Sequence, residues 1–252
     1  MRFGLNLSAN LVLVFLAGVA TAQPAPISYK LSGDVGAAAY GTQSIIRSKK
    51  NETTLLPYLF ADYGRFFARV DTLGVKTFPI GNGYLELVGR VSQDGWRANI
   101  GTLGGLTDRK TPLPIGLGTF QQTPYGAFVV NAFVNAGSAR GSLLEATYAA
   151  EVKLGNVSLY PQLGVERRSA QYNNYLYGVT PSEALASGYA AYNAGVSTTP
   201  MLGLAADYSL TENWIINMQL RRKWLDSAAT NSPLVVRKTQ DTGYVGLLYR
   251  FK

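Results

Sequence analysis

The chain has 252 residues, among them 27 glycines, 16 tyrosines and 10 phenylalanines, and only 15% are charged, with a formal net charge of +8. It contains no cysteine and no histidine, which excludes a disulfide-stapled fold and the metal sites and catalytic triads that depend on these side chains. A mean hydropathy of +0.03 is typical of strands that present an apolar side chain at every second position.

Residues 1–22 are predicted to be a secretory signal peptide. Arg2 precedes an apolar stretch, residues 11–19, and Ala20-Thr21-Ala22 then supplies the small side chains that a signal peptidase reads. The apolar stretch is too short for a membrane-spanning helix, which needs roughly 20 residues. Cleavage after Ala22 leaves one predicted domain, residues 23–252, which loses only Arg2 and keeps a net charge of +7.

Alternation of apolar and polar residues predicts an all-β chain of twelve antiparallel strands. Because short turns alternate with long loops, twelve strands place both termini on the periplasmic side of an up-and-down outer-membrane β-barrel. Residues 54–80 alternate poorly, and a single long hairpin there would leave ten strands. Pro161 is expected to mark a bulge or an unpaired position. The predicted strands lie near residues 28–41, 54–62, 64–71, 73–79, 83–92, 113–122, 125–137, 142–154, 157–170, 199–210, 213–225 and 237–251.

The predicted strand at residues 213–225 shows how the two faces divide. Trp214 and Trp224 bound its apolar face. At about 3.3 Å per residue and roughly 40° of tilt they lie about 25 Å apart along the membrane normal, the height of the band between two aromatic girdles. The opposite face is polar and is predicted to line the lumen. Across the strands the predicted lumen charges are Glu86, Arg90, Glu145, Glu151, Lys153, Asp207 and Arg221.

Four long loops, residues 42–53, 93–112, 171–198 and 226–236, are predicted on the extracellular side, and basic residues gather in them and at the neighbouring strand ends. Solubility of exposed loops would account for these side chains. So would charge-assisted hydrogen bonds to the phosphates of lipopolysaccharide. Nucleic acid is not expected as a partner of an exported barrel. The candidate lipopolysaccharide contacts are Arg47, Lys49, Lys50, Arg222, Arg237 and Lys238.

The last predicted strand carries an assembly signal. Gly246, Tyr249 and Phe251 match the pattern x-Gly-x-x-aromatic-x-aromatic that the barrel assembly machinery reads. A terminal strand of a soluble sandwich would also alternate, but together with the signal peptide this pattern favours an outer-membrane barrel.

The longest loop is rich in tyrosine. Tyrosine suits burial with its hydroxyl hydrogen-bonded, so this loop is predicted to pack over the mouth of the barrel as a lid. The alternative is an exposed adhesive contact surface. The residues concerned are Tyr172, Tyr175, Tyr177, Gly178, Tyr189 and Tyr192.

The same loop resembles the MipA/OmpV family, the MltA-interacting proteins of Gram-negative outer membranes. Residues 172–184, YNNYLYGVTPSEA, are similar to the family pattern Y-x-x-x-Y-Y-G-V-x-x-x-E-A, with departures at Leu176 and at Lys252 after the terminal Phe251. The resemblance implies a barrel that scaffolds peptidoglycan enzymes, bringing together a lytic transglycosylase and a bifunctional synthase. Other members of the family are linked to adhesion, stress responses and drug uptake.

Catalysis is not expected, and no cofactor is predicted. The hydrolases known among outer-membrane barrels use a histidine base, which this chain lacks. Glu145 and Glu151 leave carboxylate chemistry open, although lumen charges of mixed sign more often pair with each other. A narrow porin-like channel is the second hypothesis, since twelve strands can enclose a narrow lumen.

Overall fold

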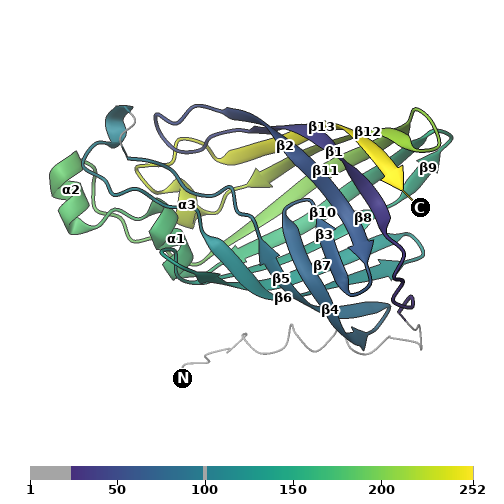
Figure 1. Ribbon diagram of the computed structural model, residues 1–252. Coiled ribbons are helices and arrows are strands. Elements are labelled where there is room, and N and C mark those ends of the chain that lie inside the picture. The colour runs from purple at the N-terminus through teal and green to yellow at the C-terminus, as the bar shows by residue number, and fades with distance from the viewer. Residues whose placement is uncertain (1–23, 99–100, 252) are drawn as a thin grey trace, which may run out of the picture.

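The structure is a computed structural model and describes residues 24–98 and 101–251. The predicted signal peptide, its cleavage after Ala22 and Lys252 lie outside the described residues. Each strand pairs antiparallel with its neighbour along the chain, except that β8 and β9 both pair with β10, and β1 pairs with β13, so the sheet closes into a barrel (Figure 1). The strands are β1 (Ser32–Thr42), β2 (Glu52–Tyr63), β3 (Phe66–Arg69), β4 (Thr72–Ile80), β5 (Gly83–Arg90), β6 (Leu113–Thr123), β7 (Gly126–Ala136), β8 (Ser142–Ala150), β9 (Val152–Leu154), β10 (Val157–Arg168), β11 (Ser197–Ser209), β12 (Trp214–Trp224) and β13 (Thr239–Phe251).

Twelve strands form the wall, because β8 and β9 pair with β10 in one continuous register and act as a single strand. The twelve-strand prediction is confirmed, and the ten-strand alternative is wrong. The break between β8 and β9 falls at Glu151, opposite Tyr160, and the adjacent Pro161 pairs with Leu204 of β11 but has no pairing on the β8 side. This is the locally unpaired position expected at Pro161, since proline has no N–H to donate.

Residues 54–80, where the alternation of apolar and polar residues is weak, contain an unusually short hairpin formed by β3 and β4. The strand predicted at residues 64–71 is too long, because Gly64 (φ 59°) and Arg65 form one turn and Val70 (φ 57°) begins the next. β3 therefore has four residues and stops partway along the wall, while β2 beside it has twelve. A strand of four residues is too short to show alternation, which explains why the sequence left this region open.

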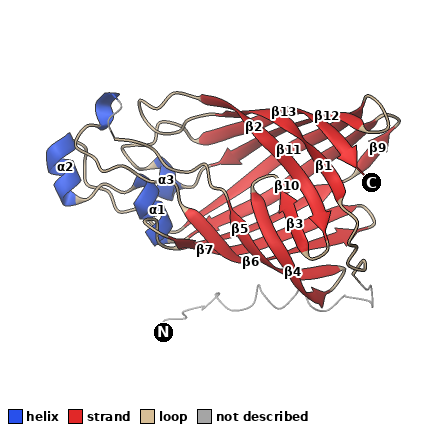
Figure 2. Ribbon diagram, in the orientation of Figure 1, coloured by secondary structure: helices blue, strands red, loops and turns tan. Residues whose placement is uncertain are grey.

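The loops at one end of the barrel pack into a cap (Figure 2). They are residues 43–51, 91–112, 169–196 and 225–238, and they contain η2 (Gly101–Leu103), α1 (Ala170–Tyr177), α2 (Pro181–Ser187) and α3 (Ser227–Thr230). The alternation pattern predicted only loops here. Helix signals were nevertheless present, because Thr180 and Glu183 form a reciprocal capping box with Pro181 at the first helical position. None of the helices in the described part of the chain has the length and apolarity that a bilayer crossing requires.

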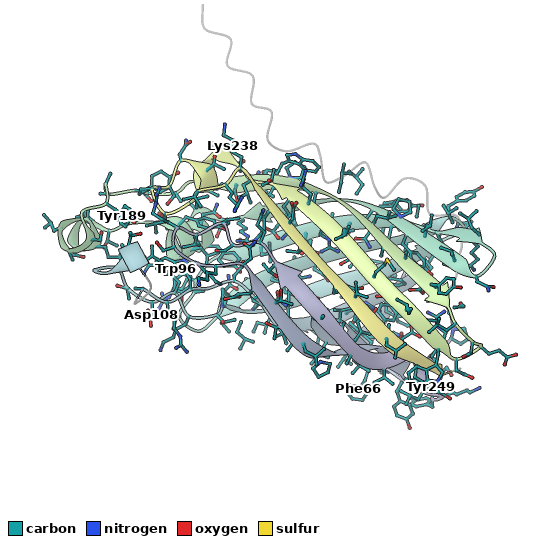
Figure 3. The ribbon with its side chains drawn as sticks, turned by 90° about the horizontal axis from the view of Figure 1, so that it is seen from above. Phe66, Trp96, Asp108, Tyr189, Lys238 and Tyr249 are labelled. Carbon is teal, nitrogen blue, oxygen red and sulfur yellow. The ribbon has the colours of Figure 1, made fainter. Side chains whose placement is uncertain are left out.

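The barrel thus has two different ends (Figure 3). The cap end holds Trp96, Asp108 and Tyr189, whereas Phe66 and Tyr249 lie at the opposite end, where short turns join the strands. We call this second end the turn end. β1 begins there and β13 ends there (Figure 1). That the turn end faces the periplasm follows from the rule of short periplasmic turns and stays a prediction.

Candidate functional site: the capped lumen

The lumen contains three cavities along the barrel axis. The upper cavity, beneath the cap, has a volume of about 210 Å³, the middle one about 350 Å³ and the lower one, at the turn end, about 500 Å³. Val70, Gln219 and Tyr244 line all three. The cavities are therefore neighbours separated by side chains, and within residues 24–98 and 101–251 no helix or strand lies between them.

Ion pairs occupy much of the lumen. Arg69 binds Glu86 through two hydrogen bonds of 2.8 Å, and Arg90 binds Glu145 at 2.5 Å. At the turn end Arg250 binds Asp34 at 2.7 Å and Asp207 at 3.0 Å. Because these charges are largely buried, each ion pair offsets the desolvation penalty that either charge would have without its partner.

The structure places the charges predicted for the lumen in two settings. Glu86, Arg90, Glu145 and Asp207 lie inside and are engaged in the ion pairs above. Arg221 lines the upper and middle cavities. Glu151 lines the lower cavity and forms an exposed ion pair with Lys153 at the turn end, 3.3 Å apart. Arg69 and Arg250 also carry charge in the lumen, although they were not among the predicted lumen charges. The alternation of their strands places both on the lumen face.

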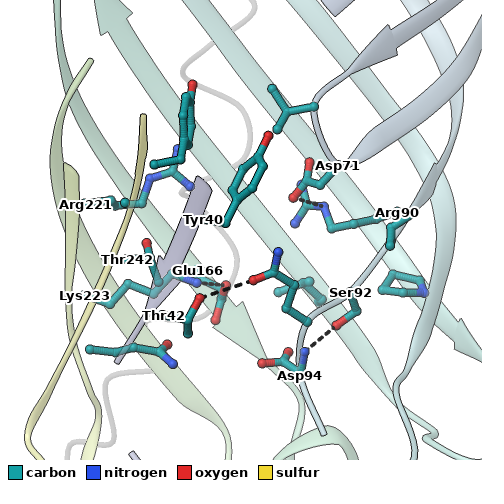
Figure 4. A pocket seen from close by; sticks show the side chains of 18 of the residues that line it. Tyr40, Thr42, Asp71, Arg90, Ser92, Asp94, Glu166, Arg221, Lys223 and Thr242 are labelled. Atoms are coloured by element: carbon teal, nitrogen blue, oxygen red, sulfur yellow. Dashed lines mark hydrogen bonds and ion pairs between the residues drawn. The ribbon is translucent and has the colours of Figure 1, made fainter. Parts of the chain in front are cut away.

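A network of charges links the wall to the cap. Lys223 binds Glu166 at 2.9 Å, and Arg168 binds both Glu166 at 2.7 Å and Asp94 at 3.0 Å. The Tyr172 hydroxyl donates to Asp94 at 2.9 Å. Burial, reinforced by the negative charge of Asp94, raises the pKa of Tyr172 well above its ordinary value. The hydroxyl therefore stays protonated and acts as a fixed donor. Figure 4 shows Glu166 and Lys223 facing Arg90 and Asp71 across this upper cavity.

The cap has its own hydrophobic core. Its buried side chains come from all four cap loops and from the strand ends below, and Tyr172 is 0% exposed. The indole N–H of Trp96 donates to the Leu176 carbonyl at 3.0 Å, and the Ser232 hydroxyl donates to the Tyr177 carbonyl at 2.6 Å. Burial raises the pKa of Tyr177 to about 12. These bonds join loops that are far apart in the sequence into one body.

The predicted tyrosine cluster is spread through this cap. Tyr172 and Tyr177 are buried, while Tyr175, Tyr189 and Tyr192 pack around the core and keep their hydroxyls hydrogen-bonded to Lys110, Thr102 and Ala228. Gly178 ends α1 with extended backbone, and its N–H donates to the Asn174 carbonyl. The cluster covers the mouth, and its function as a lid stays a proposal.

A buried ion pair clamps α2 to the loop after β5. Arg109 binds Glu183 through contacts of 2.9 and 3.2 Å and also donates to the Gly178 carbonyl. Burial acts to raise the pKa of the Glu183 carboxyl, but the hydrogen bonds from Arg109, Thr180 and Thr107 outweigh it and lower the pKa to about 2. Nothing in the alternation pattern pointed to Arg109, because its partner lies 74 residues away in a helix that was not foreseen.

Several of the basic residues proposed for lipopolysaccharide are already engaged. Arg47 and Arg237 donate to the backbone carbonyls of Pro233 and Ser44. Lys49 pairs with Glu52 at 3.3 Å, and Arg222 pairs with Asp241 at 2.7 Å. Lys50 and Lys238 are both exposed at the cap end. They remain near the surface, so the lipopolysaccharide contact stays a proposal.

The outward face carries the predicted girdle and assembly residues. Trp214 and Trp224 point outward at opposite ends of β12, and Trp214 packs edge-on against Tyr249, with ring centroids 5.4 Å apart. Gly246, Tyr249 and Phe251 lie in β13, which pairs with both β1 and β12. Their role in assembly is a property of the folding pathway and stays a prediction.

Comparison with known proteins agrees with this architecture. The family model "MltA-interacting protein MipA" matches residues 35–251. The Escherichia coli K12 protein YiaT is 24% identical over 97% of this chain and 99% of its own length. The MltA-interacting protein of E. coli K12 is 29% identical over 58% of this chain and 59% of its own, and outer membrane protein Omp26La of Vibrio anguillarum is 29% identical over 70% and 65%. The chain is therefore an outer-membrane β-barrel and belongs to the MltA-interacting protein (MipA) family.

Proposed function

We propose that the protein is a non-catalytic scaffold of the outer membrane that holds peptidoglycan enzymes at its periplasmic end. The observation that carries the proposal is the packed cap above an ion-paired lumen, because a barrel closed in this way is suited to anchoring rather than to free passage of solutes. A lytic transglycosylase is the first partner, since one relative is named for its interaction with MltA. A peptidoglycan synthase is the second, by family resemblance.

The proposal assigns different partners to the two ends. The turn end faces the periplasm and presents exposed turn residues such as Tyr125 and Glu212 to the enzymes. The cap end faces outward, and the proposed contacts with lipopolysaccharide there are Arg47, Lys49, Lys50, Arg222, Arg237 and Lys238. Gly246, Tyr249 and Phe251 are the signal for the barrel assembly machinery. Catalysis is absent from the proposal because the chain has no histidine or cysteine and its buried carboxylates are engaged with arginines and lysines.

Photo-cross-linking in intact envelopes tests the scaffold. A photoreactive residue at Tyr125, in the turn between β6 and β7, should capture a lytic transglycosylase. The matched control is Leu185 on α2, which is 91% exposed at the cap end and should capture none. Equal capture from both positions, or none from Tyr125, would argue against a scaffold at the turn end.

A narrow channel is the second candidate, because three adjacent cavities share lining residues along the axis. Planar-bilayer recordings separate the two functions. The scaffold predicts silence from the intact protein, whereas a channel predicts steady open steps. If the tyrosine-rich loop is a lid, deletion of residues 173–190 should raise conductance while the barrel stays heat-modifiable.

A further inference from the structure

The barrel wall is interrupted beside β2. β2 pairs with β1 from Glu52 to Asp62 but with β3 only from Phe60 to Tyr63. The last bond on this side runs from the Val70 N–H to the Leu59 carbonyl at 2.8 Å. From Glu52 to Tyr58 no strand of the described chain lies on this edge of β2, since the β3–β4 hairpin ends at Val70 and Asp71 (Figure 1).

Side-chain exposure shows that the interruption is open. Leu55 points outward and is 74% exposed, while Leu56 points inward and is still 38% exposed. Tyr58, two residues further along the inward face, is buried. Across the opening lie Val70 and Val91, which are 38% and 66% exposed. The opening is therefore bordered by apolar side chains on both sides.

The upper cavity reaches this opening from inside. Val70 and Val91 line the cavity together with Arg90, Arg221 and Lys223 (Figure 4). The backbone at the edge fits a wet interior, because a free N–H or C=O facing hydrocarbon is costly and is tolerated where it borders a polar cavity. Pro57 reduces that cost, since it has no N–H to leave unpaired.

Within the described part of the chain, one cation that lines the cavity, Arg221, has no acidic partner. Arg90 and Lys223 bind Glu145 and Glu166. Arg221, among the residues that the structure describes, has the amide oxygen of Gln162 at 3.2 Å as its partner and forms no ion pair. An apolar entrance leading to an arginine without a carboxylate is complementary to a molecule with an acyl chain and an anionic head.

We propose that the interruption is a lateral portal through which an anionic, acylated lipid from the membrane leaflet at the cap end reaches the upper cavity. Its head group binds Arg221 beside Lys223, and its chain lies against Leu55, Leu56 and Val91. A volume of about 210 Å³ accommodates a compact head such as a phosphate and leaves the chain in the opening. This site is separate from the turn end where the scaffold function is placed.

Binding of dodecyl phosphate to the full-length protein in phosphatidylcholine nanodiscs tests the portal. Arg221→Gln should weaken binding about tenfold or more, which corresponds to the loss of one charge-assisted hydrogen bond. The matched control is Arg167→Gln, because Arg167 is exposed on β10 and donates to the Thr198 hydroxyl rather than lining the cavity. Equal losses in the two variants, or no loss in either, would overturn the proposal.

Two further measurements use the unaltered protein. Inorganic phosphate should compete poorly with dodecyl phosphate, and equal affinity would mean a site for free anions rather than for a lipid. Dodecyl phosphate with a diazirine at the end of its chain should label Leu55, Leu56 and Val91 above the rest of the outward surface. Uniform labelling around the barrel would show that the chain stays in the bilayer and would also overturn the portal.

Discussion

The wall from β10 to β13 and the wall from β2 to β5 are built differently. β10 pairs with β11 over twelve residues and β12 with β13 over eleven. β2 pairs with β3, and β3 with β4, over four residues each. The first region closes the barrel with long ladders of hydrogen bonds, whereas the second leaves part of β2 without a neighbour.

The difference separates a wall with long, complete hydrogen-bond ladders from a wall in which part of β2 has no neighbouring strand. Long ladders satisfy every backbone group that faces lipid. The short hairpin gives up such bonds on one side of the upper cavity, and the loop that follows β5 crosses to the cap, where Trp96 and Arg109 fix it to α1 and α2. The cap therefore compensates for an incomplete wall, and four changes test this division.

Breaking the clamp between the loop and α2 should have the largest effect. Arg109→Met leaves the Glu183 carboxylate buried without its partner, which costs about 3–5 kcal/mol. The double variant Arg109→Met/Glu183→Leu should recover much of that loss. Protease cutting within residues 170–190 and the free energy of unfolding would measure both variants. A double variant as unstable as the single one would contradict the clamp.

A charge in the lipid-facing wall should come next. Met218→Arg puts a cation on the outward face of β12 and should cost about 2–4 kcal/mol in the free energy of unfolding. Gln219→Arg is the matched control, because Gln219 faces the lumen cavities and should be tolerated. Equal unfolding free energies would reject the assignment of the two faces.

Acidification should loosen the cap. The folded pKa of Glu183 is lowered to about 2, so its contribution to stability is present above the ordinary glutamate pKa of about 4.3 and is lost as the pH falls toward 2. Trp96 emission, read in a Trp214→Phe/Trp224→Phe background, should shift to longer wavelength in this range. Glu183→Gln should remove that dependence, and an unchanged shift in this variant would assign it to other carboxyls.

Sequence alone predicted the regular wall because alternation is local. Trp214 to Trp224 spans a full strand, so its two faces can be read without knowing any partner. The mixed charges of the lumen could be placed in the same way, as at Glu86 and Arg90. Their pairing could not, because Arg90 and Glu145 are 55 residues apart and meet only when the barrel closes.

The cap and the opening beside β2 could not be predicted from the alternation of apolar and polar residues, and the reasons differ. The capping box at Thr180 and Glu183 is a local signal that could have revealed α2. The burial of Trp96 beneath α1, in contrast, depends on four loops meeting in space. The opening beside β2 depends on where β3 ends, and a valine at a turn position that favours glycine gave no sign of a turn.

That valine provides the smallest and most local test. Val70 has φ 57°, a conformation that costs a β-branched residue about 1–3 kcal/mol, and it begins a two-residue turn where glycine is normal. Val70→Gly relieves the strain but makes the unfolded chain more flexible, so the net gain in the free energy of unfolding should be about 1 kcal/mol. Val165→Gly is the control, since Val165 lies within the long ladder of β10 at a similar exposure and should lose stability. Because the Val70 side chain also lines all three cavities, its removal should widen the connection between them and increase any conductance of the protein. A loss of stability at Val70 as large as that at Val165 would mean that the hairpin tip is held by its packing and that the interrupted wall stores no strain.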